Sequence, residues 1–124
     1  MPKGELVMPA RFVILHHRLR DGEHWDLMLE HGDVLLTWQL LREPVDASSF
    51  PIPARRIGDH RKAYLEYEGS VTRGRGTVRR IDAGNVEIAF TDNDHVQLAV
   101  AGTRLRGRFV LELVRGEDWL LVPR

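Results

Sequence analysis

Short runs of β-favouring residues, separated by turn residues, recur along this 124-residue chain from Arg11 to its end. Branched and aromatic side chains favour strands, whereas Gly, Asn, Asp and Pro favour turns. No stretch has the period and length of a convincing helix. This spacing predicts one all-β domain, an antiparallel barrel or sandwich of about eight strands. The strands are expected at residues 11–17, 23–30, 34–41, 63–67, 77–81, 86–91, 96–100, 109–114 and 119–122.

The remaining segments are expected to be irregular. Residues 1–10 are predicted to form a flexible lead-in, and residues 11–124 the single domain. Residues 42–61 contain Pro44, Pro51 and Pro53 and are predicted to form one long loop. Residues 82–85 (DAGN) have the composition of a turn. A loop as long as 42–61 inside a compact domain is often functional.

The absence of cysteine limits the chemistry that is available. Without cysteine there is no disulfide and no cysteine-held zinc, so a metal must be bound by His, Asp or Glu. No apolar run is long enough to cross a bilayer, and residues 1–5 lack the pattern of a signal peptide. We therefore expect a cytoplasmic protein that has no membrane partner.

Histidine and aspartate side chains gather in the first two predicted strands. Alternation along residues 23–30 places His24 and Asp26 on one face. If the two strands are adjacent, either His16 or His17 joins them. Two imidazoles and a carboxylate suit a divalent transition metal and leave coordination positions for water and substrate. A His-x-Asp pair also occurs on ordinary half-solvated strands, so spacing alone leaves a plain polar face as the alternative.

Several ordered motifs together cover about residues 11–115. They are 12–17 (FVILHH), 24–30 (HWDLMLE), 34–38 (VLLTW), 59–60 (DH) with Tyr64, 66–69 (EYEG), 76–78 (GTV) and 105–111 (LRGRFVL). In this order they resemble the 3′-phosphoesterase domain of bacterial DNA ligase D. The resemblance implies a small β-barrel enzyme that uses Mn²⁺ or another divalent transition metal. Such enzymes remove a 3′-terminal ribonucleotide by phosphodiester cleavage and then the remaining 3′-phosphate.

The resemblance also implies roles for individual residues. His17, His24 and Asp26 correspond to the metal ligands. His60 is expected to contact the scissile phosphate or donate a proton, and Tyr64 to support the same site. Apart from the resemblance, arginines of the basic segment 55–80 are expected to assist, Arg55 and Arg56 in catalysis and Arg61, Arg73 and Arg75 in substrate binding.

The chain departs from the family pattern at two functional positions. Met28 stands where the family has an arginine, and Gly58 where it has a glutamate. The spacer from His17 to His24 is also one residue longer than in typical members. Arginine binds phosphate oxygens through a planar fork of donors, which methionine lacks. Three hypotheses follow: an active phosphoesterase, a catalytically weakened module that binds nucleic-acid ends, and a barrel that binds a metal or small ligand in an unrelated pathway.

Charge is unevenly distributed along the chain. The formal net charge is zero, but residues 21–46 carry seven acids against one base. Residues 55–80 carry eight bases against three acids. A neutral total argues against non-specific coating of DNA, whereas the basic segment favours a phosphodiester backbone. The expected partners are nucleic-acid 3′ ends, as DNA or a DNA–RNA primer-template, together with ligase or end-joining proteins.

Overall fold

The structure, a computed structural model, describes residues 7–44 and 47–124. Within these residues two short 3₁₀ helices, η1 (Ala47–Ser49) and η2 (Lys62–Leu65), interrupt nine strands. None of the described helices is long and apolar enough to cross a membrane. The strands are β1 (Val7–Leu19), β2 (Gly22–His31), β3 (Val34–Leu40), β4 (Ile52–Arg61), β5 (Gly69–Ser70), β6 (Thr77–Asp92), β7 (His95–Gly102), β8 (Arg106–Arg115) and β9 (Asp118–Pro123).

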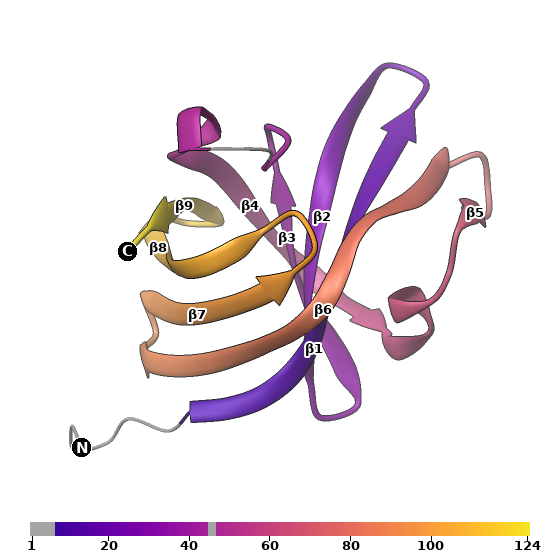
Figure 1. Cartoon of the computed structure of the whole chain (residues 1–124). Helices are drawn as coiled ribbons and strands as arrows, with labels where there is room; N and C mark the ends of the chain where they lie inside the picture. Colours follow the sequence, from indigo (N-terminus) through magenta and orange to yellow (C-terminus); the bar gives the residue numbers. More distant parts are fainter. Residues whose placement is uncertain (1–6, 45–46) are drawn as a thin grey trace.

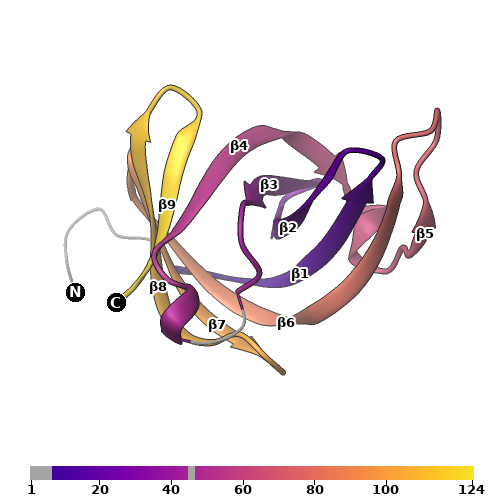
Figure 2. The same cartoon turned by 90° about the horizontal axis from the view of Figure 1, so that it is seen from above.

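Eight of these strands close into a barrel. The ring runs β1–β2–β3–β4–β9–β8–β7–β6 and returns to β1, and neighbouring strands are antiparallel. Figures 1 and 2 show these strands wrapping around a common interior, with β5 outside the ring on β6. Closure pairs the edges that an open sheet would expose. The predicted all-β antiparallel barrel is therefore confirmed.

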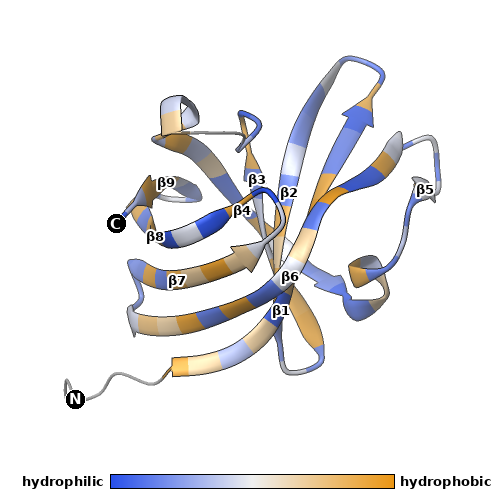
Figure 3. Ribbon diagram, in the orientation of Figure 1, coloured by the Kyte–Doolittle hydropathy of each residue, from blue (hydrophilic) through white to orange (hydrophobic). Residues whose placement is uncertain are grey.

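The barrel interior is filled by one large apolar cluster to which every ring strand contributes. Phe12, Leu27, Trp38, Ile88 and Leu111 are among its fully buried members. Along each strand these side chains alternate with others that point outward, as the pleat requires. The alternation is visible in Figure 3 as bands of hydrophobic and hydrophilic colour along the ribbons.

A second, smaller apolar cluster lies on the outer face of β1, β2 and β3. Its buried members are Val13, Leu15, Met28, Leu35, Leu65 and Val78. Leu65 belongs to η2, and Tyr64 and Val71 pack against the same cluster. Residues 62–76, here called the cap segment, therefore cover the outside of the barrel at this point. This covered outer face carries the candidate site.

Two predicted irregular segments are strands in the structure. Residues 52–61 of the predicted 42–61 loop form β4, which pairs with β3 and β9. Pro53 removes one donor at the start of the ladder, but Ile52 and Ala54 are buried in the barrel core. Residues 82–85, predicted to form a turn, lie inside the continuous strand β6. In both places tertiary pairing overrides the local turn signal.

Two other boundaries also differ from the prediction. Residues 63–67 were expected to form a strand, whereas 62–65 form η2 and cover the outer cluster. The lead-in was expected to reach residue 10. Its residues 1–6 lie outside the described residues, whereas 7–10 belong to β1 and pair with β6. The barrel therefore begins four residues earlier than local composition indicates.

Candidate metal centre

The register between β1 and β2 brings the predicted ligands together. His17 lies directly opposite His24, and Leu15 lies opposite Asp26. Residues that face each other across an antiparallel pair project from the same face of the sheet. All three polar side chains therefore emerge on the outer face, at the edge of the apolar cluster beneath the cap segment. The predicted adjacency of the first two strands is confirmed.

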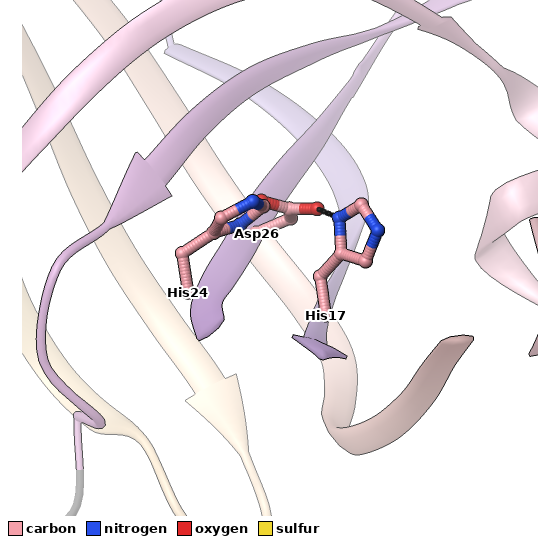
Figure 4. Close-up of side chains that lie close together, drawn as sticks. All are labelled: His17, His24 and Asp26. Atoms are coloured by element: carbon pink, nitrogen blue, oxygen red, sulfur yellow. Dashed lines mark hydrogen bonds and ion pairs between the residues drawn. The ribbon is translucent and has the colours of Figure 1, made fainter. Parts of the chain in front are cut away.

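The three side chains converge on a small volume. His24 Nδ1 lies 2.7 Å from Asp26 Oδ1, and His17 Nδ1 lies 3.5 Å from Asp26 Oδ2 (Figure 4). One candidate ligand atom from each residue lies within 4.8 Å of the other two. The imidazole rings meet edge to face, with centroids 4.7 Å apart. Asp26 is only 3% exposed, so its carboxylate depends on these neighbours for compensation.

The hydrogen bond between His17 and the main chain of Arg75 determines which ring nitrogen of His17 faces Asp26. His17 Nε2 lies 2.6 Å from the main-chain oxygen of Arg75. A carbonyl oxygen only accepts, so Nε2 carries the proton and donates it. In neutral His17 the Nδ1 lone pair then points at the Asp26 carboxylate, an arrangement that calls for a proton or a cation between them. A histidine that donates its outer N–H to a carbonyl is typical of metal ligands.

The same contacts shift the pKa values of His17 and Asp26. The hydrogen bond to Asp26 is the main cause that raises the pKa of His17 above its ordinary value of 6.5. Burial pushes the pKa of Asp26 upward, but hydrogen bonds from His17 and His24 more than offset it. The pKa of Asp26 therefore lies below its ordinary value of 3.8. The metal-free cluster holds an aspartate anion against a histidine that binds a proton readily.

His16, the sequence neighbour of His17, lies on the opposite face of β1. Its ring stacks on Trp25, with centroids 4.9 Å apart and planes 3° from parallel. Its Nε2 contacts Glu23 at 2.6 Å. The alternative that the sequence left open between His16 and His17 is therefore resolved in favour of His17 beside His24 and Asp26.

A pocket of about 320 Å³, here called the His60 pocket, opens beside His17 and Asp26. Its lining residues are His17, Asp26, Met28, Asp59, His60, Arg61, Tyr64, Val71, Arg75 and Val78. His60 comes from the end of β4, and Tyr64 from η2 in the cap segment. The two rings meet edge to face at 5.5 Å. The structure thus brings His60, Tyr64, Arg61 and Arg75 to the candidate metal centre.

His60 is held by its inner nitrogen. Its Nδ1 lies 3.0 Å from the Gly58 carbonyl and 3.1 Å from Thr37 Oγ1. The carbonyl requires Nδ1 to donate, and the Thr37 hydroxyl gives its own proton to the Leu35 carbonyl at 3.1 Å. Both contacts are therefore satisfied by an Nδ1–H donor. Nε2 remains as the nitrogen of His60 that can exchange a proton with a ligand.

Three of the predicted arginines lie away from the pocket lining. Arg56 projects to the inner face, where its guanidinium stacks 4.4 Å above the Trp38 ring and contacts Asp59 at 3.4 Å. Arg55 lies on the outer face opposite Gln39, and Arg73 sits in the cap segment with a positive φ of 63°. None of the three lines the His60 pocket. Alternation along β4 turns Arg56 away from the pocket, because adjacent residues of a strand point to opposite faces. Arg55 shares the outer face with the site, but it does not line the pocket.

The residues at the two divergent family positions have different surroundings. Met28 is 1% exposed and forms part of the apolar floor of the His60 pocket, opposite Thr37. Gly58 is exposed, and an added Cβ would meet nothing within 4 Å. Met28 therefore gives the pocket an apolar surface at the position where the resemblance implies a charged arginine. The positive charge of this pocket comes from Arg61 and Arg75.

Sequence reasoning missed two polar residues of β3 that support the site. Thr37 holds His60, and Gln39 Nε2 lies 3.4 Å from His24 Nε2. Both interrupt the otherwise apolar run 34–41 with the period of two that marks one face of a strand. That interruption was the available signal. Another hollow, of about 670 Å³, lies over β1, β6, β7 and β8 and shares no residue with His17, His24 and Asp26.

Fold and cluster together define a small closed β-barrel with a potential three-residue metal centre on its outer face. The chain belongs to the DNA ligase D 3′-phosphoesterase domain family, whose model matches residues 15–113. It is 32% identical over 116 residues to the multifunctional non-homologous end joining protein LigD of Mycobacterium bovis, which covers 88% of this chain. The multifunctional non-homologous end joining DNA repair protein LigD of Mycobacterium tuberculosis gives the same values. The multifunctional non-homologous end joining protein LigD of Mycolicibacterium smegmatis is 27% identical over 124 residues. The chain spans only about 15% of the length of these relatives.

Proposed function

We propose that this domain is a divalent-metal-dependent 3′-phosphoesterase that processes nucleic-acid 3′ ends. It would remove a terminal ribonucleotide, a 3′-phosphate or both. One observation carries the proposal: the ligand atoms of His17, His24 and Asp26 lie within 4.8 Å of one another beside a pocket lined by His60 and two arginines. Its substrate would be a DNA end or a DNA–RNA primer-template. Because its relatives are named as end-joining proteins, we extend the proposal to DNA end joining with a ligase or other end-joining proteins as partners.

The residues present fit a divalent transition metal such as Mn²⁺. Two nitrogens and a carboxylate oxygen form a suitable donor set, and three protein ligands leave positions for other groups. The bond from His17 Nε2–H to the Arg75 carbonyl supplies the outer support that metal-ligating histidines commonly have. A metal bound here would supply Lewis acidity to a phosphoryl oxygen.

The remaining roles belong to groups of the chain itself. Arg61 and Arg75 line the His60 pocket and would neutralise charge on the phosphoryl oxygens. His60, held at Nδ1 by Gly58 and Thr37, would donate a proton from Nε2 to the leaving oxygen. Tyr64 packs against the His60 ring and limits its movement. Met28 and Val78 close the floor of the pocket with apolar surface.

Mutation of the cluster tests the proposal directly. His24→Ala and Asp26→Ala should abolish both Mn²⁺ binding and cleavage of a 3′-phosphorylated primer, because each removes one of three ligands. His95→Ala is a matched control, since His95 contacts Asp92 in an exposed turn between β6 and β7. Full manganese-dependent cleavage by either cluster variant would show that the site assignment is wrong.

The buried Met28 favours one alternative function. A pocket that lacks the family arginine binds phosphate with fewer charged donors, so the domain would recognise 3′ ends with little turnover. Purified protein with Mn²⁺ and a 3′-ribonucleotide or 3′-phosphate primer separates the two functions. Turnover supports the enzyme. Binding that weakens steeply with salt, without turnover, supports the end-binding module.

A further inference from the structure

The His60 pocket continues into a second hollow beneath the cap segment. This hollow, here called the Tyr67 hollow, has a volume of about 210 Å³. It shares Arg61, Tyr64, Val71 and Arg75 with the His60 pocket, and it is completed by Ala63, Tyr67, Ser70 and Thr72. Because the two hollows share these lining residues, a ligand held in the His60 pocket can extend into the Tyr67 hollow.

Aromatic rings run from one hollow to the other. Tyr64 meets His60 edge to face at 5.5 Å and Tyr67 edge to face at 5.7 Å. Tyr67 is 40% exposed, so part of its surface is open to a ligand. Its hydroxyl donates to the main-chain oxygen of Ser70, which fixes the orientation of the ring. A fixed, partly exposed aromatic ring offers a stacking surface at a low entropic cost.

The charge of the Tyr67 hollow suits an electron-rich ligand. Arg61 and Arg75 line it, and its lining contains no acidic residue. The Arg75 side chain is held in place because it donates to the Thr72 carbonyl and to Thr72 Oγ1, each at 3.0 Å. Aromatic and cationic groups together bind nucleobases with little sequence preference, because every base has a stacking face.

We propose that the Tyr67 hollow is a nucleobase subsite, which takes the base of the nucleotide whose 3′ oxygen carries the phosphate bound beside His60. The inference rests on the proposed function, which places that phosphate in the adjoining pocket. The shared wall of Tyr64, Arg61 and Arg75 then sets the neighbouring base against Tyr67. Stacking of the base would add affinity with little preference for one base over another.

The test uses a single-stranded oligonucleotide that ends in 2-aminopurine with a 3′-phosphate, without added divalent metal so that no turnover occurs. Stacking on a tyrosine quenches 2-aminopurine fluorescence. Wild-type protein should quench the fluorescence, and Tyr67→Leu should lose the quenching and about tenfold in affinity. Tyr67→Phe is the matched control, because it keeps the ring and, like leucine, lacks the hydroxyl that binds Ser70. Thermal unfolding checks that both variants are folded.

Two reference oligonucleotides separate failure of the subsite from failure of the proposed function. One carries the 3′-phosphate on an abasic terminal residue, and the other ends in a 3′-hydroxyl. Tenfold weaker binding of the abasic end supports the subsite. Equal binding of abasic and base-bearing phosphorylated ends overturns the subsite and leaves the proposed function standing. Equal binding of 3′-phosphate and 3′-hydroxyl ends contradicts phosphate recognition itself, and the subsite falls with it.

Discussion

The imidazole of His17 donates its Nε2–H to the main-chain carbonyl of Arg75 at 2.6 Å, so a candidate metal ligand on β1 is tied to the cap segment. Arg75 also lines the His60 pocket. The orientation of the candidate ligand His17 and the placement of Arg75, the proposed phosphate-binding residue, therefore depend on one short loop. The close approach of that loop to β1 can be tested at its glycines.

Gly76 allows the loop to reach β1. It has a φ of +81°, and an added Cβ would lie 2.0 Å from the Arg18 carbonyl oxygen, which no side chain tolerates. Gly76→Ala should push the loop outward and weaken Mn²⁺ binding by about 10- to 100-fold through loss of the His17 support. It should also destabilise the fold by about 1–3 kcal/mol. Metal titration and denaturant unfolding measure the two effects.

Gly74 provides the control for this substitution. It has a φ of +65° in the same loop, but an added Cβ would meet nothing within 4 Å. Gly74→Ala should therefore show only the modest cost of a left-handed alanine, about 1 kcal/mol, with metal affinity unchanged. Similar loss of metal affinity in both variants would mean that backbone conformation, rather than contact with β1, positions Arg75.

The stability of the metal-free protein should depend on pH through His17 and Asp26. Because the pKa of His17 is raised above 6.5, its contribution to stability is complete below 6.5 and is lost as the pH rises through the raised value. Because the pKa of Asp26 is lowered below 3.8, its contribution is present above 3.8 and is lost as the pH falls through the lowered value. The two contributions are therefore complete together between pH 3.8 and pH 6.5, where the pair stabilises the metal-free fold most.

Asp26→Asn removes this pH dependence. The wild-type free energy of unfolding, measured in a chelator, should fall relative to that of Asp26→Asn as the pH rises through the pKa of His17. Mn²⁺ affinity should change in the opposite direction, since the metal competes with the proton for His17. Stability curves of the two proteins that stay parallel across this range would contradict the assigned pair.

Thr37 should act as a positioning residue for His60. It is fully buried, and its oxygen accepts from His60 Nδ1 at 3.1 Å while its own proton goes to the Leu35 carbonyl. Thr37→Val keeps the shape and removes the acceptor, leaving only the Gly58 carbonyl. Turnover should fall about tenfold. Mn²⁺ affinity should not change, because Thr37 does not belong to the metal cluster.

The conservative variant completes this test. Thr37→Ser retains the hydroxyl and should restore most of the turnover that Thr37→Val loses. A variant series in which serine is as slow as valine would show that the threonine methyl group, and therefore packing, determines the effect. Reduced Mn²⁺ affinity in Thr37→Val would instead indicate that the whole outer face had shifted.

The proximity of His17, His24 and Asp26 could be predicted from the sequence because it depends on local rules. His24 and Asp26 share a face through alternation alone, and His17 joins them once two consecutive strands form the common antiparallel pair. The arginines could not be placed in this way. Arg55 and Arg56 face opposite sides of β4, which lies in a proline-containing segment that was predicted to be a loop. Arg75 reaches the pocket from a loop whose path depends on Gly76.

The misread segment 82–85 shows a different limit. Asp82 and Gly84 have turn composition, yet both serve long-range contacts within a strand. At Gly84 an added Cβ would lie 2.3 Å from the Ala101 carbonyl oxygen, so the glycine allows close approach of β7. A sequence shows that a residue is small or acidic, but not whether its partner is local or about twenty residues away.

Asp82 is the second of these residues, and its carboxylate organises the connection between β7 and β8. It is 5% exposed and accepts main-chain N–H donors from Ala83 at 2.9 Å, Thr103 at 2.8 Å, Arg104 at 3.1 Å and Leu105 at 2.7 Å. The main-chain N–H groups of loop residues 103–105 thus find their hydrogen-bond acceptor in Asp82 of β6. Buried backbone donors without such a partner are costly.

Asp82→Asn should therefore destabilise the fold by about 2–4 kcal/mol, because the side-chain amide replaces one acceptor with a donor that opposes the loop N–H groups. The free energy of unfolding in denaturant measures this loss. Mn²⁺ affinity should stay unchanged, since the loop is not part of the metal cluster. Asp92→Asn is the matched control: Asp92 binds the Asp94 N–H and His95 in an exposed turn, so its loss should be clearly smaller. Equal stability of Asp82→Asn and wild type would mean that the loop finds other acceptors, and that closure of the barrel beside Phe12 and Gly102 does not depend on this carboxylate.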